Sequence, residues 1–437
     1  MAATARPELA QARLARAMRH EGRRSALLVF ALLLVVYAAG IGLPSTPGRD
    51  LRPSEARALL TTESLVSGGG FDVSDEYRTR AWRDFYDGEL RPKSDAVDGR
   101  LLDTQGAAFP ALLAPAYAIG GRLAVELFLA AIAAAGFAVA AALGRRLVPD
   151  PWATGSALAT GLSPPAGLAA TTISPAMTCA ALVAGAALLA LRVRDDSHGG
   201  PAVACALLLA PVIWLFPLAA APAAVVAAAL FRWLRRRRRA WTGIAAIEIV
   251  LISLIVYVSV NGRLYGGWTP YSADAAPGPP TAIEGVGDVV DRLPRVATLW
   301  LDPAFGVVLY APFLALGFGS LWLLWQSRRD RLSRAFPAAV DVEVAAGFLA
   351  AICAAAFVAA VVFVPSLGGR VPAETLAVAL PCAAGLCAWA LRRWVRLGTV
   401  LAAIGVALTC WMLVAARLDG DGAVSPPRGS VPWAQID

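Results

Sequence analysis

Acidic side chains gathered in one polar segment near the N-terminus are the residues best suited to carry chemistry. Residues 43–105 hold twelve of the 31 Asp and Glu residues of the chain. A carboxylate placed beside a hydroxyl group can remove its proton and so act as a general base. We therefore expect the chemistry of the protein in this segment.

Three carboxylates of the segment stand out, and each also has a purely structural explanation. Glu55 lies at the start of a predicted helix, where a carboxylate is favoured by the helix macrodipole whether or not it is catalytic. Asp50 lies close to the end of the first hydrophobic span and can fold back on it, or it is a solvated turn residue. Asp103 precedes the second span. The remaining acidic residues fit turns and helix caps.

The elements that must position these residues are membrane-spanning helices. The chain is 58% hydrophobic and only 16% charged, whereas soluble domains are about 25% charged. Apolar runs of about twenty residues recur along it, long enough to cross a bilayer as helices. The sequence predicts an all-α polytopic membrane protein with about eleven transmembrane helices (ten to twelve), at residues 25–43, 107–143, 152–171, 174–191, 201–215, 216–231, 241–260, 304–325, 343–364, 371–391 and 397–416.

The arginine distribution gives these spans an orientation. Cytoplasmic loops of membrane proteins carry an excess of Lys and Arg. With the N-terminus in the cytoplasm, each alternate loop carries at least two arginines, and residues 232–239 carry six. The prediction is therefore a basic cytoplasmic segment at 1–24, a transmembrane domain at 25–417 with external loops at 44–105 and 261–303, and a disordered external tail at 418–437.

The first external loop is expected to contain two amphipathic surface helices. Pro53 can start the first, whose apolar stripe includes Ala56, Leu59, Leu60 and Val66, and three glycines at 68–70 end it. The second contains the aromatic residues of 77–86, which suit the headgroup layer of a membrane. The alternative is a linker with scattered aromatics.

Several other classes of site and partner are excluded or disfavoured. All six cysteines fall inside apolar spans, which is typical of small buried side chains and not of a disulfide framework. His20 and His198 lie in basic loops, so no histidine is available for a catalytic triad or a zinc site on the acidic side. The net charge of +8 comes from short arginine runs between spans and does not indicate nucleic-acid binding.

The order of these features resembles the GT-C superfamily of integral-membrane glycosyltransferases, and is closest to the protein-mannosyltransferase-like branch that includes the lipid A aminoarabinose transferases. The similarity extends over residues 25–381. The stretches that carry it read ESLVSGGGFDVSDEY, FPALLAPAYAIGGR, TTISPAM, LYGGWTP, DPAFGVVLYAPF and LGGRVPAETLAVALP.

Four positions depart from the family pattern. Ser54 stands where the family places the Asp of an Asp-Glu pair, and Gln105 falls near a common His. Ala176 replaces a Glu after the proline of a short outer loop, and Glu374 replaces an Arg of the last external loop.

The resemblance implies transfer of a sugar from a polyprenyl-phosphate carrier to a hydroxyl acceptor at the external face. Glu55, which keeps the family's Glu position, is the first choice for the base, and Asp50 is the second. Arginine binds phosphate oxygens in two places, so the phosphate of the donor is expected to contact Arg57, Arg263 and Arg370, each of which is explained as well by an interfacial arginine.

The remaining contacts are expected to involve aromatic side chains and one carboxylate. Trp268 and Tyr271 can stack on a sugar ring, and Asp103 can contact the sugar or the acceptor. No metal site is expected in the loops. The Asp-x-Asp pattern at Asp419 and Asp421 can hold a divalent cation, although a lone pattern in a polar tail is weak evidence.

Two other functions stay open at this point. An inactive member of the family would bind lipid-linked glycans or partners, which the four departures favour. A lipid or solute transporter or flippase would need ionisable residues within spans, and Glu126 and Glu248 are the two well inside them.

The composition also indicates a host and a location. A bias toward Ala, Arg and Gly with a single lysine, Lys93, is typical of a GC-rich genome. We expect a multi-pass protein of a bacterial inner membrane. Its partners would be a polyprenyl-phosphate-linked sugar donor, membrane lipids and an envelope glycan, lipid or protein acceptor.

Overall fold

The computed structural model describes residues 5–43, 50–94, 96–97, 99–195, 200–236, 240–273, 286–302, 306–328, 337–364 and 371–418. Within them the chain is helical apart from turns and isolated β-bridges, one of which joins Val97 and Arg100. Seven described helices are long and apolar enough to cross a membrane: α1 (Ala5–Ala39), α4 (Ala108–Gly144), α7 (Ala176–Asp195), α10 (Ala220–Arg236), α11 (Ala240–Leu264), α17 (Pro337–Val362) and α20 (Val395–Leu418). The predicted all-α polytopic membrane fold is confirmed.

The other four predicted spans are each made of shorter helices in series. These series are α5 (Trp152–Gly161) with α6 (Pro164–Ala170), α8 (Gly200–Leu209) with α9 (Val212–Leu215), α14 (Val307–Tyr310) with η4 (Pro312–Ala315) and α15 (Leu316–Gln326), and α18 (Val371–Ala377) with α19 (Leu380–Arg393). Proline explains the breaks, because it lacks an N–H and favours the first turn of a new helix. Pro164, Pro211, Pro312 and Pro381 each lie at such a start.

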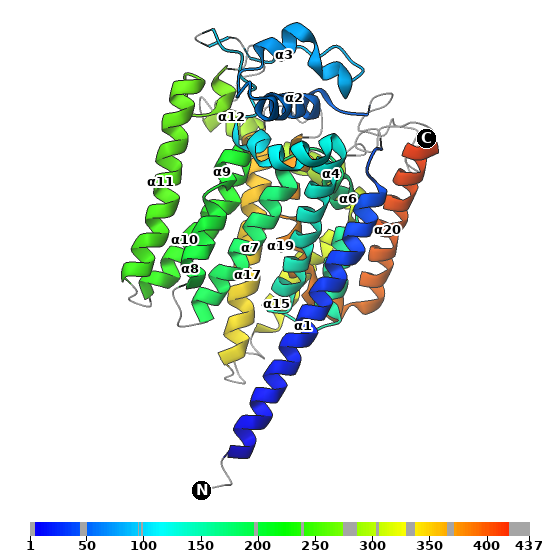
Figure 1. The fold of residues 1–437 in the computed structure, drawn as a ribbon. Helices are drawn as coiled ribbons and strands as arrows, with labels where there is room; N and C mark the ends of the chain where they lie inside the picture. The colour runs from blue at the N-terminus through cyan, green and yellow to red at the C-terminus, as the bar shows by residue number, and fades with distance from the viewer. Residues whose placement is uncertain are drawn as a thin grey trace.

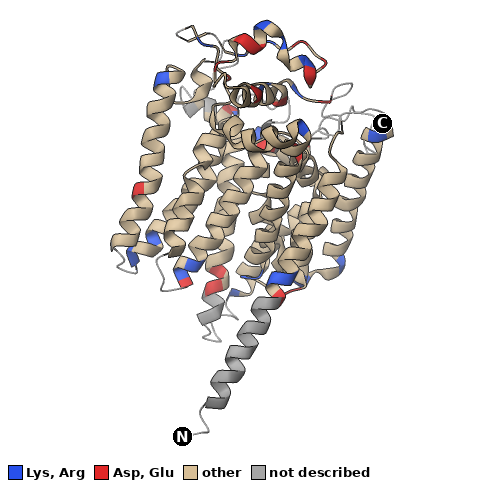
Figure 2. Cartoon of the chain, viewed as in Figure 1, with Lys and Arg blue, Asp and Glu red and all other residues tan. Residues whose placement is uncertain are grey.

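The arrangement of the helices agrees with an odd number of crossings. Helix α1 enters the bundle from the end opposite to α2 (Pro53–Ser67), whereas α20 ends on the same side as α2 (Figure 1). The described charged residues gather at the two ends of the bundle, and the band between them is almost free of charge (Figure 2). The count of eleven spans and the assignment of the cytoplasmic side stay predictions.

Helix α4 lies at the centre of the bundle and contacts α1, α2, α5, α7 and α19. Small side chains allow this close packing. Gly136 of α4 faces Ala181 of α7, and a methyl group at Gly136 would come within 3.2 Å of that alanine. Tight contacts between small residues therefore fix the centre of the bundle on which the first loop rests.

The first predicted surface helix is confirmed as α2. It begins after Arg52 and ends at Gly68, whose φ of 93° suits glycine. The apolar stripe is buried at Ala56, Leu59 and Leu60. Val66, which we predicted to belong to it, is 42% exposed because it lies in the last turn, beyond the bundle.

The prediction of a second surface helix as a single element is wrong. It divides into α3 (Ser74–Thr79) and the 3-10 helix η1 (Ala81–Asp84), because Arg80 adopts the left-handed conformation with φ of 60°. Trp82 and Tyr86 are buried against the core, so these aromatic rings pack on protein and not in a headgroup layer. Helix α3 lies above α2 at the end of the bundle (Figure 1).

Candidate functional site

The start of α2 is held by a buried ion network around Arg52. The backbone N–H of Arg52 donates to Glu55 Oε2 at 2.7 Å, and its Nη2 donates to Glu55 Oε1 at 3.2 Å. The backbone N–H of Ile173, in the α6–α7 connection, also donates to Glu55 Oε1, at 3.1 Å. Arg52 Nη1 pairs with Glu374 of α18. The network therefore joins the first loop to two other segments at this end of the bundle.

Both carboxylate oxygens of Glu55 are engaged in this network, and the residue is only 1% exposed. Burial alone would lower the pKa of Arg52, but the charges of Glu55 and Glu374 outweigh burial and hold that pKa above its ordinary value. The arrangement is a capping box, in which the third residue of a helix bonds back to the residue before it. As it stands, it fixes the helix start, and both oxygens of Glu55 accept hydrogen bonds from the protein.

Asp50 belongs to a second charged group, centred on Arg122 of α4. Arg122 Nη1 lies 3.8 Å from Asp50 Oδ2, and Arg122 Nε donates to Glu126 Oε1 at 2.7 Å. Glu126 is 6% exposed, whereas the Asp50 side chain is 63% exposed. Glu126 also interacts electrostatically with Glu55 and Asp50, so this group lies beside the Arg52 network.

A kink in α4 places Arg122 at this level. Gly120 and Gly121 have non-helical backbone angles, and the φ of 58° at Gly121 is one that glycine adopts without strain. The helix before the kink lies across the end of the bundle, and the helix after it descends into the bundle (Figure 1). Arg122 and Glu126 therefore lie at the top of the descending part.

Asp103 and Arg57 form a third group, on another side of α2. Arg57 Nε lies 3.9 Å from Asp103 Oδ1, and the Asp103 side chain is 3% exposed. The backbone N–H of Gln105 donates to Asp103 Oδ1 at 3.4 Å. Asp103 Oδ2 and Arg57 Nε are both buried and have no hydrogen-bond partner among the described residues.

These two side chains line a small enclosed cavity between α2, the start of α3 and residues 92–103. It has room for about one water-sized group. Its other polar lining residues are Thr61, Tyr77, Lys93 and Ser94. Burial raises the pKa of Asp103, and Arg57 and Lys93 oppose that rise.

The other residues predicted to contact the donor or the acceptor are not part of these three charged groups. Trp268 is 79% exposed, and Arg263 is exposed on the last turn of α11. Tyr271, in η3 (Pro270–Ala273), is partly exposed and interacts electrostatically with Glu374 and Asp103. It therefore lies in the neighbourhood of both the Arg52 network and the Asp103 group. Arg370 and the Asp419–Asp421 pattern lie outside the described residues.

The four departures from the family pattern are now located. The side-chain amide of Gln105 donates to the carbonyl of Ser54 at 2.9 Å, so two of the departures are in contact. Glu374 is the carboxylate that pairs with Arg52. Ala176 is fully buried at the start of α7. The substitution at 374 therefore holds the first loop against the bundle, and the one at 105 joins the two ends of that loop.

Sequence reasoning did not identify Arg52 and Arg122 as site residues. It also missed that Arg122 pairs with Glu126 and that Arg52 pairs with Glu374. A signal for Arg52 was present in the sequence. Arg52 directly precedes Pro53, and in a capping box a Glu three positions later, here Glu55, bonds to the backbone N–H of that residue. Arg122 and Glu126 are four residues apart and so share a helix face. Nothing in the sequence indicated the contact between Arg52 and Glu374, which are 322 residues apart.

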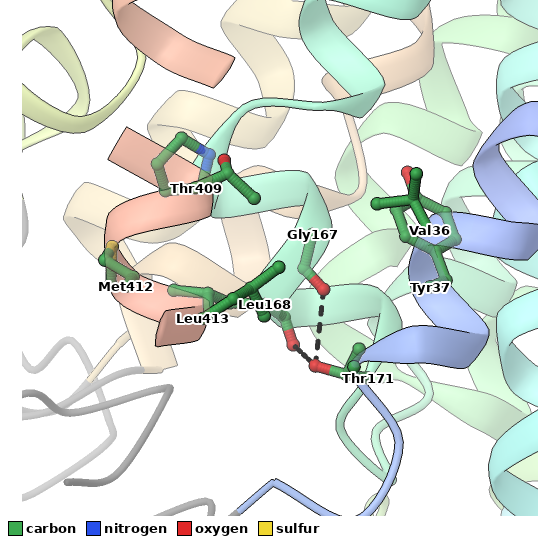
Figure 3. Close-up of a pocket in the computed structure, with 10 residues that line it drawn as sticks. Val36, Tyr37, Gly167, Leu168, Thr171, Thr409, Met412 and Leu413 are labelled. Carbon is green, nitrogen blue, oxygen red and sulfur yellow. Dashed lines mark hydrogen bonds between the residues drawn. The ribbon is translucent and has the colours of Figure 1, made fainter. Parts of the chain in front are cut away.

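A small apolar groove, with room for about one water-sized group, lies beside this end of the bundle, between α1, α6 and α20 (Figure 3). Its hydroxyl groups bond to backbone carbonyls: Tyr37 to Gly161 at 2.8 Å, Thr171 to Leu168 at 3.1 Å, and Thr409 to Leu162 at 2.6 Å. The groove therefore presents an apolar lining. Thr171 at its rim is two residues from Ile173, which bonds Glu55.

Among the described residues, no group of three or more His, Cys, Asp or Glu side chains is arranged to hold a metal ion. Glu126 is paired with Arg122, and Glu248 is exposed on α11, in contact with neither. These two intramembrane carboxylates do not form a connected path.

Comparison with known proteins gives a likeness in fold. No protein-family model and no curated sequence matches the chain. The structure is similar to ArnT from Cupriavidus metallidurans bound to undecaprenyl phosphate, with 16% identity and a TM-score of 0.54, over 90% of this chain and 65% of that one. It is also similar to the apo state of that protein, with 16% identity and a TM-score of 0.51, over 90% and 64% of the two chains.

A third likeness, to the archaeal oligosaccharyltransferase AglB from Archaeoglobus fulgidus, has 12% identity and a TM-score of 0.48 over 94% and 58% of the two chains, and is too distant to carry an argument. The expected resemblance to GT-C proteins is therefore confirmed at the level of the fold. The chain spans 65% of the length of the ArnT chain and shares its membrane fold.

Proposed function

We propose that this chain is a membrane glycosyltransferase that moves a sugar from a polyprenyl-phosphate carrier to a hydroxyl acceptor at the α2 end of the bundle. One observation carries the proposal. On a fold similar to that of ArnT, which was solved with undecaprenyl phosphate bound, buried arginines and carboxylates from the first loop, α4 and α18 gather beneath and around α2.

The chemistry of the donor fits this arrangement. The phosphate needs a cation, and the Arg57 guanidinium has five N–H donors, of which Nε has no partner among the described residues. The isoprenoid chain needs an apolar surface, which exposed side chains of α1 and α20 such as Val35 and Val414 offer. Arg122, anchored by Glu126, is a second cation at this level.

Binding and transfer test the proposal. We expect the purified full chain to bind undecaprenyl phosphate in native mass spectrometry, and to transfer sugar when given a panel of polyprenyl-phosphate hexoses and pentoses with membrane extracts as acceptor. Arg57→Gln removes a charge-assisted hydrogen bond of about 1.5–3 kcal/mol, so binding should weaken by about 10-fold or more. Arg78→Gln, in an exposed pair on α3, is the control and should bind normally.

A wild type that neither binds the carrier nor transfers sugar from any donor of the panel would contradict the proposal. Equal binding by wild type and Arg57→Gln would remove Arg57 from the phosphate site while leaving the function in place.

A second candidate is an inactive protein that binds lipid-linked glycans. It is favoured by Glu55, whose two oxygens are occupied, and by Ser54, which supplies no carboxylate. This candidate predicts that the wild type, Glu55→Gln and Asp50→Asn all bind the carrier and that none of them transfers sugar. Transfer by the wild type that either substitution abolishes would exclude it.

A further inference from the structure

We propose that helix α11 is the contact surface for a second copy of this chain, and that Glu248 hydrogen-bonds the same residue of that copy inside the membrane. The inference goes beyond the proposed function and does not depend on it. It starts from one observation. Glu248 is exposed within a membrane-spanning helix and has no hydrogen-bond or ion-pair partner among the described residues.

The Glu248 side chain points away from the bundle. Helix α11 lies at the edge of the bundle (Figure 1) and packs mainly against α8 and α10. Ala246 and Tyr257, on its bundle-facing side, are 2% and 3% exposed. On the same side, the Ser253 hydroxyl donates to the Ala210 carbonyl at 2.8 Å. At about 3.6 residues per turn, Glu248 lies about 180° round the helix from Tyr257.

The depth of Glu248 in the membrane makes a lone carboxyl group costly. Trp241 and Leu264 bound the apolar span of α11. With a rise of about 1.5 Å per residue, Glu248 lies about 10 Å along the axis from Trp241 and about 24 Å from Leu264. The hydrocarbon core is about 30 Å thick, so this position lies within it. No water is available there, and an unpartnered carboxyl group costs free energy. The position therefore favours a partner that brings a hydrogen-bonding group to the same depth.

The face around Glu248 has the spacing of a helix–helix contact. Trp241, Ile244, Leu251 and Ile255 are reached from Glu248 by alternating steps of three and four residues, and they are 85%, 45%, 51% and 56% exposed. These steps are those of the a and d positions of left-handed helix pairs, the commonest arrangement of membrane helices. A single polar residue at an a position fixes the register of such a pair, and Glu248 is the one polar residue of this stripe from Trp241 to Ile255.

A second copy of the chain is the occupant that this chemistry favours. Copies of one chain insert in the same orientation, so their Glu248 residues lie at the same depth on parallel helices. A twofold interface places the same patch of both copies in contact. A carboxyl group accepts hydrogen bonds and, when protonated, also donates one. Two such groups therefore satisfy each other, and no other chemical group is required.

Disulfide cross-linking of the full chain in cell membranes tests the contact surface. Ile255→Cys, in the stripe, should give cross-linked dimers under mild oxidation. Leu254→Cys is the matched control, because Leu254 is 41% exposed at the same depth but points about 100° away round the helix. It should cross-link no more than the wild type, whose exposed Cys410 on α20 sets the background.

Dimerisation of Glu248 variants tests the hydrogen bond. The measurement is single-molecule photobleaching of the labelled full chain in lipid vesicles over a series of protein-to-lipid ratios. Glu248→Leu should insert, because leucine is favoured in a membrane span, and its dimer should dissociate about 5- to 30-fold more readily. Glu248→Gln also removes the charge but both donates and accepts hydrogen bonds, so it should dimerise nearly as well as the wild type.

Three outcomes would overturn the inference. A wild type that stays monomeric over the whole series would leave Glu248 to another membrane protein or to the membrane interface. Equal dimerisation by the wild type and Glu248→Leu would remove the carboxyl group from the contact. Equal cross-linking of Ile255→Cys and Leu254→Cys would place the contact on another surface. None of these readouts depends on sugar transfer, so each leaves the proposed function in place.

Discussion

Each side of helix α2 holds an arginine beside a carboxylate, but the two sides differ in how completely these groups are hydrogen-bonded. On one side, Arg52 binds two carboxylates, and each oxygen of Glu55 has a partner. On the other side, Arg57 and Asp103 are buried 3.9 Å apart and each keeps one atom without a described partner. Both pairs lie near the same end of the bundle, on the fold shared with ArnT.

The difference indicates which side holds segments together and which side can bind a further group. A buried charge costs free energy unless it is paired and hydrogen-bonded. A fully bonded network meets that requirement and resists change, so it suits a joint between segments. A buried acid with a free oxygen retains the capacity to bind another group, which a site for a substrate requires.

The largest expected effect on stability comes from breaking the Arg52 network. Arg52→Met leaves Glu55 and Glu374 without their cation, and removing one partner of a buried ion pair costs about 3–5 kcal/mol. We expect a loss of that order in the free energy of unfolding, measured by SDS titration in mixed micelles. Arg78→Met breaks an ion pair whose two side chains are both 77% exposed and should cost less than about 1 kcal/mol.

Equal losses from Arg52→Met and Arg78→Met would mean that the Arg52 network adds no more stability than a surface ion pair. The assignment of one side of α2 to holding segments together and the other to binding would then have no basis in stability.

A smaller effect is expected where the loop after Asp103 meets η3. Gly106 has φ of 86°, and a methyl group there would come within 3.1 Å of Pro270. Gly106→Ala should therefore cost about 1–2 kcal/mol for the left-handed backbone plus the displacement of Pro270. Gly99→Ala, at φ of 76° with nothing within 4 Å, is a matched control for the backbone cost alone.

The comparison of the two alanine variants isolates the contact with η3. If Gly106→Ala also lowers sugar transfer and Gly99→Ala does not, then the position of η3, and of Tyr271 within it, matters to the site. Equal effects on stability and transfer would show that only backbone strain is involved.

The fold could be predicted from the sequence because membrane helices depend on local composition. Apolar runs and arginine-rich loops identified the spans without any knowledge of contacts. The breaks at Pro164, Pro211 and Pro312 could have been predicted on the same local basis, since proline ends a helix wherever it lies. The turn at Arg80 could not, because a non-glycine residue at positive φ depends on its tertiary surroundings.

The site was predicted less well, because its arrangement depends on contacts between distant segments. The family resemblance pointed to Glu55, but only the structure brings Ile173 and Glu374 against Arg52 and Glu55. The sequence offered Asp103 as a contact to the sugar or the acceptor. Only the structure shows that one of its oxygens accepts a hydrogen bond and that the other has no partner among the described residues. Whether Glu55 or Asp50 takes the proton stays a prediction.

The smallest effect is expected at the far end of α2, where Glu63 has like charges for neighbours. Burial raises the pKa of Glu63, and the charges of Asp84 and Glu76 raise it further. A carboxyl group whose pKa is raised by folding stabilises the protein below its ordinary pKa and loses that contribution as the pH rises through the folded value. Glu63 therefore lowers stability at neutral pH, and Glu63→Gln should raise the free energy of unfolding by a few tenths of a kcal/mol, because the group is partly exposed and solvent screens its interactions.

The pH dependence separates this charge effect from packing. The gain from Glu63→Gln should be largest near pH 8 and should vanish as the pH falls toward the ordinary pKa of glutamate, where wild-type Glu63 also becomes neutral. Glu89→Gln, which removes an exposed carboxylate beside Arg91, should give no gain at any pH. A gain at Glu63 that persists at acidic pH would come from packing, and the unpaired carboxylate at this end of α2 would then carry no electrostatic cost.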